Sequence, residues 1–243
     1  MAEEQKRIKI IFQNENLLVV DKPSGIVVFP DENYKEGTLS GELLKIFPEL
    51  QRVNERAGIS HRLDKDTSGL MLAAKNKKTF NSIKKAFEER RVEKKYLALA
   101  SGNLKEKEGE IITLVGRAPK DRKKQKAFLL NEPEAKRKGL RLAVTEYKVL
   151  KNLADGENLY TLLEVSPKTG RKHQIRVHLA HIGHPIVGDK TYGFKGQAIP
   201  KGLNRHFLHA FSLRFQSDSR QVMEFQSPLP EDLSQVLSQL TEA

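Results

Sequence analysis

The order of β-rich and helix-like segments constrains this chain more than any other feature of its sequence. Residues 8–12 and 17–21 are β-rich runs separated by the turn-like QNEN, which predicts a hairpin. Later segments mix strands and helices without a regular βαβ rhythm, so an all-parallel sheet is not favoured. We predict an α+β fold with a largely antiparallel, mixed central sheet flanked by helices and loops. Helices are expected near 39–47, 77–91, 173–182 and 231–240. Besides the hairpin, strands are expected at 70–74, 94–101, 142–150, 159–165, 207–215 and 222–226.

Composition narrows the chemistry that such a fold can carry. The chain has 243 residues, of which 38% are apolar, so it can bury a core as one large domain or two small ones. It contains no cysteine, which excludes disulfides, zinc–thiolate sites, iron–sulfur clusters and a cysteine nucleophile. A metal site would have to be built from histidine and carboxylate alone.

The net charge indicates the kind of partner. There are 43 Lys and Arg residues against 31 Asp and Glu, which gives a formal charge of +12. A polyanion such as nucleic acid is the first expectation and an anionic membrane surface the second, and composition does not separate them. No segment approaches the roughly 18 consecutive apolar residues of a membrane-spanning helix, and the first residues lack a secretory signal. We therefore expect a cytoplasmic protein.

The positive charge is concentrated in residues 117–141. Ten Lys or Arg residues lie there against Asp121, Glu132 and Glu134. A mobile, solvated loop would explain any single lysine, but the cluster favours contact with a polyanion. Such lysines suit phosphate contacts, which supply affinity without sequence information.

Polar residues crowd the turn that precedes the apolar run LMLAA. The segment 61–76 reads HRLDKDTSGLMLAAKN, in which Asp66, Thr67 and Ser68 can bond backbone groups and Gly69 can adopt a conformation closed to other residues. An isolated Asp64 would be read as a residue that only satisfies a tight turn. The whole string instead favours a functional site around Asp64.

A second polar segment, residues 166–189, reads SPKTGRKHQIRVHLAHIGHPIVGD. His178 and His181 lie one helical turn apart, but no carboxylate has matching spacing, so we do not predict a metal site. Basic residues near the expected helix start suit anion binding, aided by the free backbone N–H groups there. They are Lys168, Arg171, Lys172 and Arg176.

Together these segments resemble the RluA family of RNA pseudouridine synthases. His61-Arg62-Leu63-Asp64 with Thr67-Ser68-Gly69-Leu70 looks like the catalytic signature, and Lys95-Tyr96-Leu97-Ala98 looks like the tyrosine motif. Gly170-Arg171 with His173-Gln174-Ile175-Arg176-Val177-His178 is similar to the basic motif, and Asp21-Lys22-Pro23-Ser24-Gly25 to the early motif. Four segments in the family's order make coincidence improbable.

The resemblance implies a pseudouridine-synthase-like fold and an isomerase that converts uridine in RNA to pseudouridine without a cofactor. Asp64 would be the ionised carboxylate that either attacks C1′ or removes a sugar proton. Arg176 would pair with Asp64 and keep it charged, and Tyr96 would stack on the uracil and assist the removal of the C5 proton. Arg62 would either stack in the space left by the flipped uridine or hold a neighbouring phosphate.

The remaining motif residues are expected to bind the RNA substrate. They are His61, Thr67, Ser68, Gly69, Arg171, Lys172, His173 and Gln174. The partner implied is a stem-loop of ribosomal or transfer RNA, with no membrane and no required protein partner, and the chain is expected to be a monomer. Because the first strand begins at Ile8, residues 1–243 are expected to form one catalytic domain without a preceding S4 domain, with 117–141 as an insertion-like stretch.

Two other classes of protein compete with this interpretation. A non-catalytic RNA-binding protein could keep the fold, although binding alone does not need Asp64, Tyr96 and Arg176 together. A metal-dependent nuclease or hydrolase would need clustered carboxylates, and a zinc deaminase would need the cysteine ligands that this chain lacks.

Overall fold

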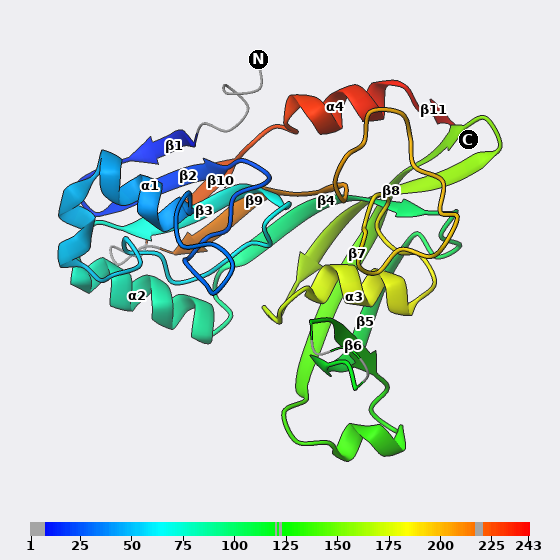
Figure 1. The fold of residues 1–243 in the computed structure, drawn as a ribbon, viewed down its shortest axis with the longest axis horizontal. Helices are drawn as coiled ribbons and strands as arrows, with labels where there is room; N and C mark the ends of the chain where they lie inside the picture. Colours follow the sequence, from blue (N-terminus) through cyan, green and yellow to red (C-terminus); the bar gives the residue numbers. More distant parts are fainter. Residues whose placement is uncertain (1–7, 120, 122, 217–220) are drawn as a thin grey trace. The chain divides into compact units, whose positions relative to one another are not determined.

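The computed structural model describes residues 8–119, 121, 123–216 and 221–243. These residues form two compact units, of which the first comprises residues up to 94 together with 209–228, and the second comprises 95–208 and 229–243. Figure 1 labels their helices and strands. The expectation of a single catalytic domain stays a prediction.

The first unit is built on a mixed sheet. The antiparallel pair β1 (Lys9–Gln13) and β2 (Leu17–Lys22) confirms the predicted hairpin. Strand β2 pairs antiparallel with β3 (Ser68–Ala74), β3 pairs parallel with β9 (Leu208–Gln216), and β9 pairs antiparallel with β10 (Val222–Gln226). The second part of the catalytic signature, residues 67–70, therefore runs into β3. The first part, residues 61–64, precedes the turn that leads into this strand.

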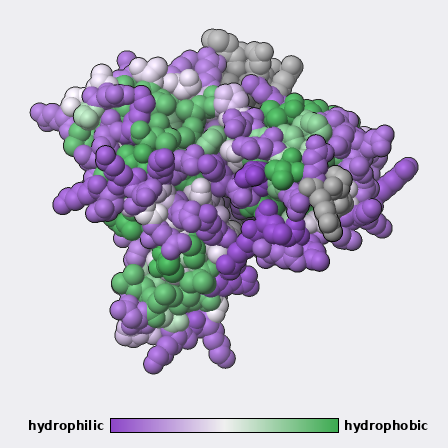
Figure 2. All heavy atoms as spheres, turned by 180° about the vertical axis from the view of Figure 1, so that it is seen from behind, coloured by the Kyte–Doolittle hydropathy of each residue, from purple (hydrophilic) through white to green (hydrophobic). Residues whose placement is uncertain are grey.

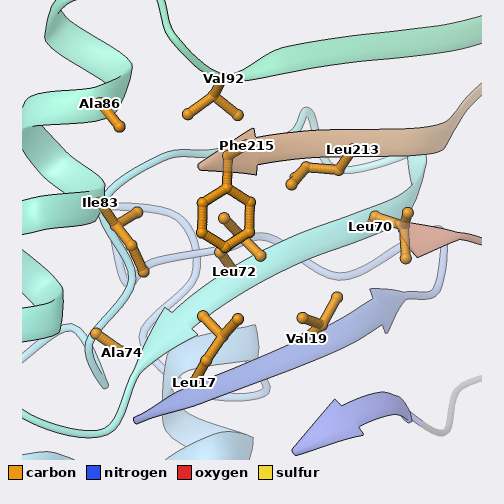
Figure 3. Packing of buried hydrophobic residues seen from close by; sticks show 10 residues of the cluster. All are labelled: Leu17, Val19, Leu70, Leu72, Ala74, Ile83, Ala86, Val92, Leu213 and Phe215. Atoms are coloured by element: carbon orange, nitrogen blue, oxygen red, sulfur yellow. The ribbon is translucent and has the colours of Figure 1, made fainter. Parts of the chain in front are cut away.

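The helices of this unit follow their sequence signals. Helix α1 (Leu39–Ile46) begins after Thr38, whose hydroxyl accepts from the Gly41 N–H, and is followed by a 3-10 turn, η2 (Pro48–Arg52). Helix α2 (Lys77–Glu88) begins after Asn76, which caps the N–H of Thr79. Ile83 and Ala86 of α2 pack on apolar side chains of β2, β3 and β9 (Figure 3), which stabilises the sheet from one face.

The second unit contains an antiparallel sheet in the order β4, β8, β7, β5, β6. Its strands are β4 (Glu93–Ser101), β5 (Glu108–Arg117), β6 (Gln125–Phe128), β7 (Arg141–Asp155) and β8 (Asn158–Pro167), with β11 (Thr241–Glu242) beside β7. The helices are α3 (Gln174–His181) and α4 (Glu231–Ser238), and a 3-10 turn, η3 (Pro133–Lys136), precedes β7. The predicted α+β class with a largely antiparallel, mixed sheet is confirmed.

The basic stretch 117–141 is more ordered than a solvated loop. Its residues 125–128 form β6, which pairs with β5, and residues 133–136 form η3. Phe128 is fully buried, and the charged ends of Lys126 and Arg137 lie 4.9 and 5.5 Å from the centre of its ring. We call residues 117–141 the basic arm. Lys120 and Arg122 lie outside the described residues.

Figure 2 shows one face of the molecule, on which polar side chains predominate and apolar side chains gather in separate patches. Within the described ranges, every helix is too short or too polar to cross a membrane.

Candidate active site

The turn that carries Asp64 is held by its backbone. The Lys65 carbonyl accepts from the Lys22 Nζ at 2.9 Å and from the Gly25 N–H at 2.9 Å. Lys22 is fully buried and also donates to the carbonyls of Pro23 and Ile26. A buried ammonium needs such acceptors, so the early motif fixes the residue that follows Asp64.

The start of the same turn is fixed by His61. Its Nε2 accepts from the Leu72 N–H at 2.9 Å, and its ring stacks on Phe87 with centroids 4.5 Å apart. Burial, with a smaller contribution from the charge of Lys94, lowers the pKa of His61 to about 3, so the ring is neutral at physiological pH. Lys94 lies over the ring of Phe87, with its Nζ 5.4 Å from the ring centroid, and burial lowers the pKa of Lys94 to about 8.

The end of the turn is fixed by a buried chain of hydrogen bonds. The Nε2 of His209 lies 3.2 Å from the Ser227 carbonyl, so it donates there and leaves Nδ1 to accept from the Ser68 hydroxyl at 3.0 Å. The Ser227 hydroxyl donates in turn to Asp21 at 2.5 Å. The turn that carries Asp64 is thus linked to β9, to the residue that follows β10 and to β2.

Gly69 is required by packing. Its φ is +125°, and a Cβ atom there would lie 2.3 Å from the Ala210 carbonyl oxygen. Thr67 and Ser68 are 1% and 2% exposed. RNA contact by Thr67, Ser68 and Gly69 stays a prediction, and their burial favours support of the turn instead.

Asp64 and Arg62 differ from these neighbours in exposure. Asp64 is half-buried and Arg62 is exposed, so both side chains remain accessible to a polynucleotide. Accessibility of Arg62 is what its predicted role in base extrusion needs.

In the second unit, Tyr96 lies on β4 opposite Val165 of β8 and is 7% exposed. Arg176 lies on α3 and is 6% exposed. Asp64 belongs to the first unit and these two residues to the second. The ion pair between Asp64 and Arg176 stays a prediction.

Arg176 is oriented by a partner that the sequence did not reveal. Its Nε and Nη2 donate to the two carboxylate oxygens of Asp189 at 2.7 and 2.9 Å. Asp189 Oδ1 also accepts from the backbone N–H groups of Thr191 and Tyr192, and the Tyr192 ring centre lies 5.1 Å from the guanidinium carbon. A bidentate pair and an aromatic face together fix the plane of the guanidinium.

The charge state of Asp189 follows from this environment. Burial is the largest effect and favours the neutral acid. The hydrogen bond and charge of Arg176, the Thr191 N–H and the charge of His206 outweigh it and hold the pKa of Asp189 below its usual value. Asp189 is therefore ionised, and its negative charge lies beside the positive charge of Arg176.

Gln174 organises the start of α3. Its Oε1 accepts from the Thr169 hydroxyl and the Arg171 N–H, and its Nε2 donates to the Val144 carbonyl and the Thr145 hydroxyl, at distances between 2.7 and 3.0 Å. The side chain is 4% exposed. Contact of Gln174 with RNA stays a prediction, while the amide has all its hydrogen-bonding capacity in use inside the protein.

The other basic-motif residues lie around the same helix start. His173 precedes α3 with a left-handed φ of 57°, and its Nδ1 is 2.8 Å from the Tyr192 hydroxyl, which also accepts from the Gln125 N–H of β6. Arg171 donates from Nε to the Leu142 carbonyl, and Lys172 is exposed. Tyr192 therefore joins the basic arm, His173 and Arg176.

His178, one of the two histidines at helical spacing, lies on α3. Its side chain is fully buried, and its Nε2 lies 3.0 Å from the Thr113 hydroxyl oxygen. Burial, with a smaller effect of His181, lowers the pKa of His178 to about 4. Across the part of the chain that the structure describes, no group of three His, Asp or Glu residues is arranged to hold a metal ion.

Sequence reasoning missed Asp189, Tyr192 and the anchoring role of Lys22. The first two follow Gly188 with the spacing D-x-x-Y, just after the basic motif. That spacing was a usable signal, because an aspartate that begins a turn commonly caps the next backbone N–H groups.

Comparison with known proteins agrees with this geometry. The family model described as RNA pseudouridylate synthase matches residues 16–181. An RNA pseudouridine synthase of Aquifex aeolicus is 42% identical over 97% of this chain and 73% of its own length. The ribosomal large subunit pseudouridine synthase D of Nitrosomonas europaea is 39% identical over 95% of this chain, which spans 64% of that protein.

A solved structure shows the same fold. Human RNA pseudouridylate synthase domain containing 1 superposes with a TM-score of 0.78 and 29% identity, over 98% of this chain and 89% of that one. The class of protein defined by these matches is an isomerase that acts on RNA. The chain belongs to the RNA pseudouridylate synthase family.

Proposed function

We propose that this protein converts specific uridines of ribosomal RNA to pseudouridine, with Asp64 as the catalytic carboxylate. The observation that carries the proposal is the construction of the Asp64 turn. Hydrogen bonds that involve Lys22, His61 and Ser68 hold the turn, while Asp64 itself is only half-buried. Such preorganisation is costly for a surface that only binds RNA and is expected of a reacting group. The large-subunit relatives favour ribosomal over transfer RNA as the target.

The reaction needs no external reagent. The N1–C1′ bond breaks, the uracil rotates while bound, the C5–C1′ bond forms, C5 loses its proton and N1 gains one. Asp64 acts either as the nucleophile on C1′ or as the base that removes a sugar proton. The substrate and product are isomers, so no cofactor is required by the balance of atoms.

The other residues serve this step. Arg176, held by Asp189, supplies a fixed positive charge that keeps Asp64 ionised. Tyr96 stacks on the uracil, because a flat ring tolerates rotation of the detached base, and its hydroxyl assists loss of the C5 proton. Arg62 occupies the space that the flipped nucleotide leaves.

General affinity for RNA comes from the basic arm. Its described basic side chains are exposed and suited to phosphates, and they are Arg117, Lys123, Lys124, Lys126, Lys136, Arg137, Lys138 and Arg141. Arg171 and Lys172 extend the same surface toward α3. We infer a cytoplasmic protein that acts as a monomer without a required protein partner.

The test uses RNA tritiated at uridine C5. The wild-type protein should release label to water, and Asp64→Asn should release none above background while binding the RNA with similar affinity. Equal release by both proteins would refute the role of Asp64. Binding without release by the wild type would instead support a non-catalytic RNA-binding protein on the same fold.

A further inference from the structure

The segment that follows Asp189 presents two large apolar side chains to solvent. Residues 190–202 follow Asp189 and precede the segment that leads into β9, and Phe194 and Ile199 among them are 55% and 52% exposed. We call residues 190–202 the Phe194 loop. A single exposed apolar residue is ordinary on a protein surface, so its surroundings decide what it means.

The Phe194 loop is held in place by its own hydrogen bonds. The Gly193 N–H donates to the Asp189 carbonyl at 2.9 Å, and the Gln197 N–H donates to the Phe194 carbonyl at 3.2 Å. A Cβ atom at Gly193 would lie 2.5 Å from Gln197 Oε1 and 2.7 Å from the Asp189 carbonyl oxygen, so the backbone is close-packed there. The exposed ring of Phe194 is therefore carried by a backbone that hydrogen bonds and close packing hold in place.

The charge of the loop selects an anionic partner. Residues 190–202 contain three lysines and no acidic residue. Lys190, Lys195 and Lys201 are exposed, and none of them forms an ion pair with any residue that the structure describes. An aromatic face among uncompensated lysines is the surface used by proteins that bind single-stranded nucleic acid.

The Phe194 loop also contacts Arg176, the arginine that we assign to the reaction. Tyr192 lies against the Arg176 guanidinium, and Phe194 follows two residues later. Two residues span at most about 7 Å, which is close to the spacing of neighbouring nucleotides in an extended strand. A nucleotide next to one that reaches Arg176 can therefore meet the Phe194 ring.

We propose that Phe194 is a stacking platform for a base that neighbours the target uridine, with Lys190, Lys195 and Lys201 binding the phosphates beside it. The proposal rests on the proposed function, since it assumes that the substrate is RNA. It assigns to this loop the capture of a flanking unpaired base while the uridine occupies the reaction site.

Because the chain contains no tryptophan, Phe194→Trp creates a single fluorescent reporter at the platform. Binding of a short oligouridylate should quench the fluorescence of this variant, because the indole stacks on a base. The matched control is Leu159→Trp, which places the reporter near the start of β8 at a position that is 45% exposed, and it should show little quenching. Equal responses at the two positions would overturn the proposal.

A kinetic series separates stacking from simple apolar contact. In the tritium-release assay, Phe194→Ala should raise KM about tenfold and leave kcat within about twofold, since stacking contributes about 1–3 kcal/mol per base. Phe194→Tyr should restore KM, and Phe194→Leu should not. An unchanged KM in Phe194→Ala, or full rescue by leucine, would refute the platform, and unchanged RNA binding would indicate a protein partner for this loop instead.

The two proposals fail in different ways. Absence of tritium release by the wild-type protein would contradict the proposed function, whereas the fluorescence experiment does not depend on turnover. Quenching at position 194 without tritium release would support base stacking at Phe194 and contradict the proposed enzyme activity.

Discussion

Replacement of Asp189 with asparagine tests how Arg176, for which we propose a catalytic role, is held in place. Asparagine has nearly the same shape, but it places an NH₂ group where one carboxylate oxygen now accepts from the Arg176 Nε at 2.7 Å. The remaining oxygen can still accept from the N–H groups of Thr191 and Tyr192. The change therefore removes the charge and half of the bidentate contact and leaves the turn intact.

The size of the effect follows from burial. The side chains of Arg176 and Asp189 are 8% and 0% exposed, so water cannot replace the lost partner of the guanidinium. Removal of one partner from a buried ion pair costs about 3–5 kcal/mol. The free energy of unfolding of most proteins is only about 5–15 kcal/mol, so the loss should be large and easily measured.

Urea unfolding followed by circular dichroism measures this loss, with the matched variant Asp232→Asn as the control. Asp232 makes the same bidentate contact with Arg205, at 2.6 and 3.1 Å, but its side chain is 37% exposed. Its loss should be smaller than that of Asp189→Asn, because water can reach the position of the Asp232 carboxylate. Equal losses in the two variants, or a loss below about 1 kcal/mol for Asp189→Asn, would refute the buried-pair reasoning. In the tritium-release assay, Asp189→Asn should lower kcat far more than it changes KM, and Asp232→Asn should change neither.

Two further predictions concern extrusion of the uridine and acid stability. Arg62→Ala should reduce turnover of a structured RNA much more than turnover of an already open loop, and equal reductions in the tritium-release assay would contradict the assigned role. Because the pKa values of His61 and His178 are lowered to about 3 and about 4, the unfolded chain binds protons below about pH 6.5 that the native chain does not, so stability falls as the pH falls. Between pH 8 and pH 5, the free energy of unfolding measured with urea should fall by about 2 kcal/mol for each of the two histidines. In His178→Gln this fall should be smaller by about 2 kcal/mol. An unchanged free energy of unfolding would contradict the assignment of neutral imidazole rings to the native state.

Local signals in the sequence predicted many of the elements. The QNEN turn between two β-rich runs predicted the β1–β2 hairpin, and Thr38 predicted the start of α1, because turn and cap residues act on their immediate neighbours. The order QKAF in the basic arm contains a short strand, but the surrounding charges obscured its alternation.

The supporting contacts of the site could not be predicted in the same way. The Ser68–His209 contact joins residues that are distant in the sequence, and the Arg176–Asp189 pair depends on the turn that follows α3. RNA contact by Gln174 stays a prediction, but the burial of its side chain could not be foreseen, because a polar residue beside basic ones has the same sequence pattern whether it is exposed or buried. Its burial depends on where Thr145 and Val144 of β7 lie, which the local sequence does not encode.

The discontinuity of the first unit has a consequence for the newly made chain. The His209 and Ser227 that support the Asp64 turn are translated after all of residues 95–208, which belong to the second unit. During synthesis from the N-terminus, the turn is made early but lacks these supports until residues 209 and 227 have also been made. The Asp64 carboxylate therefore acquires its rigid setting only after the basic arm has been synthesised.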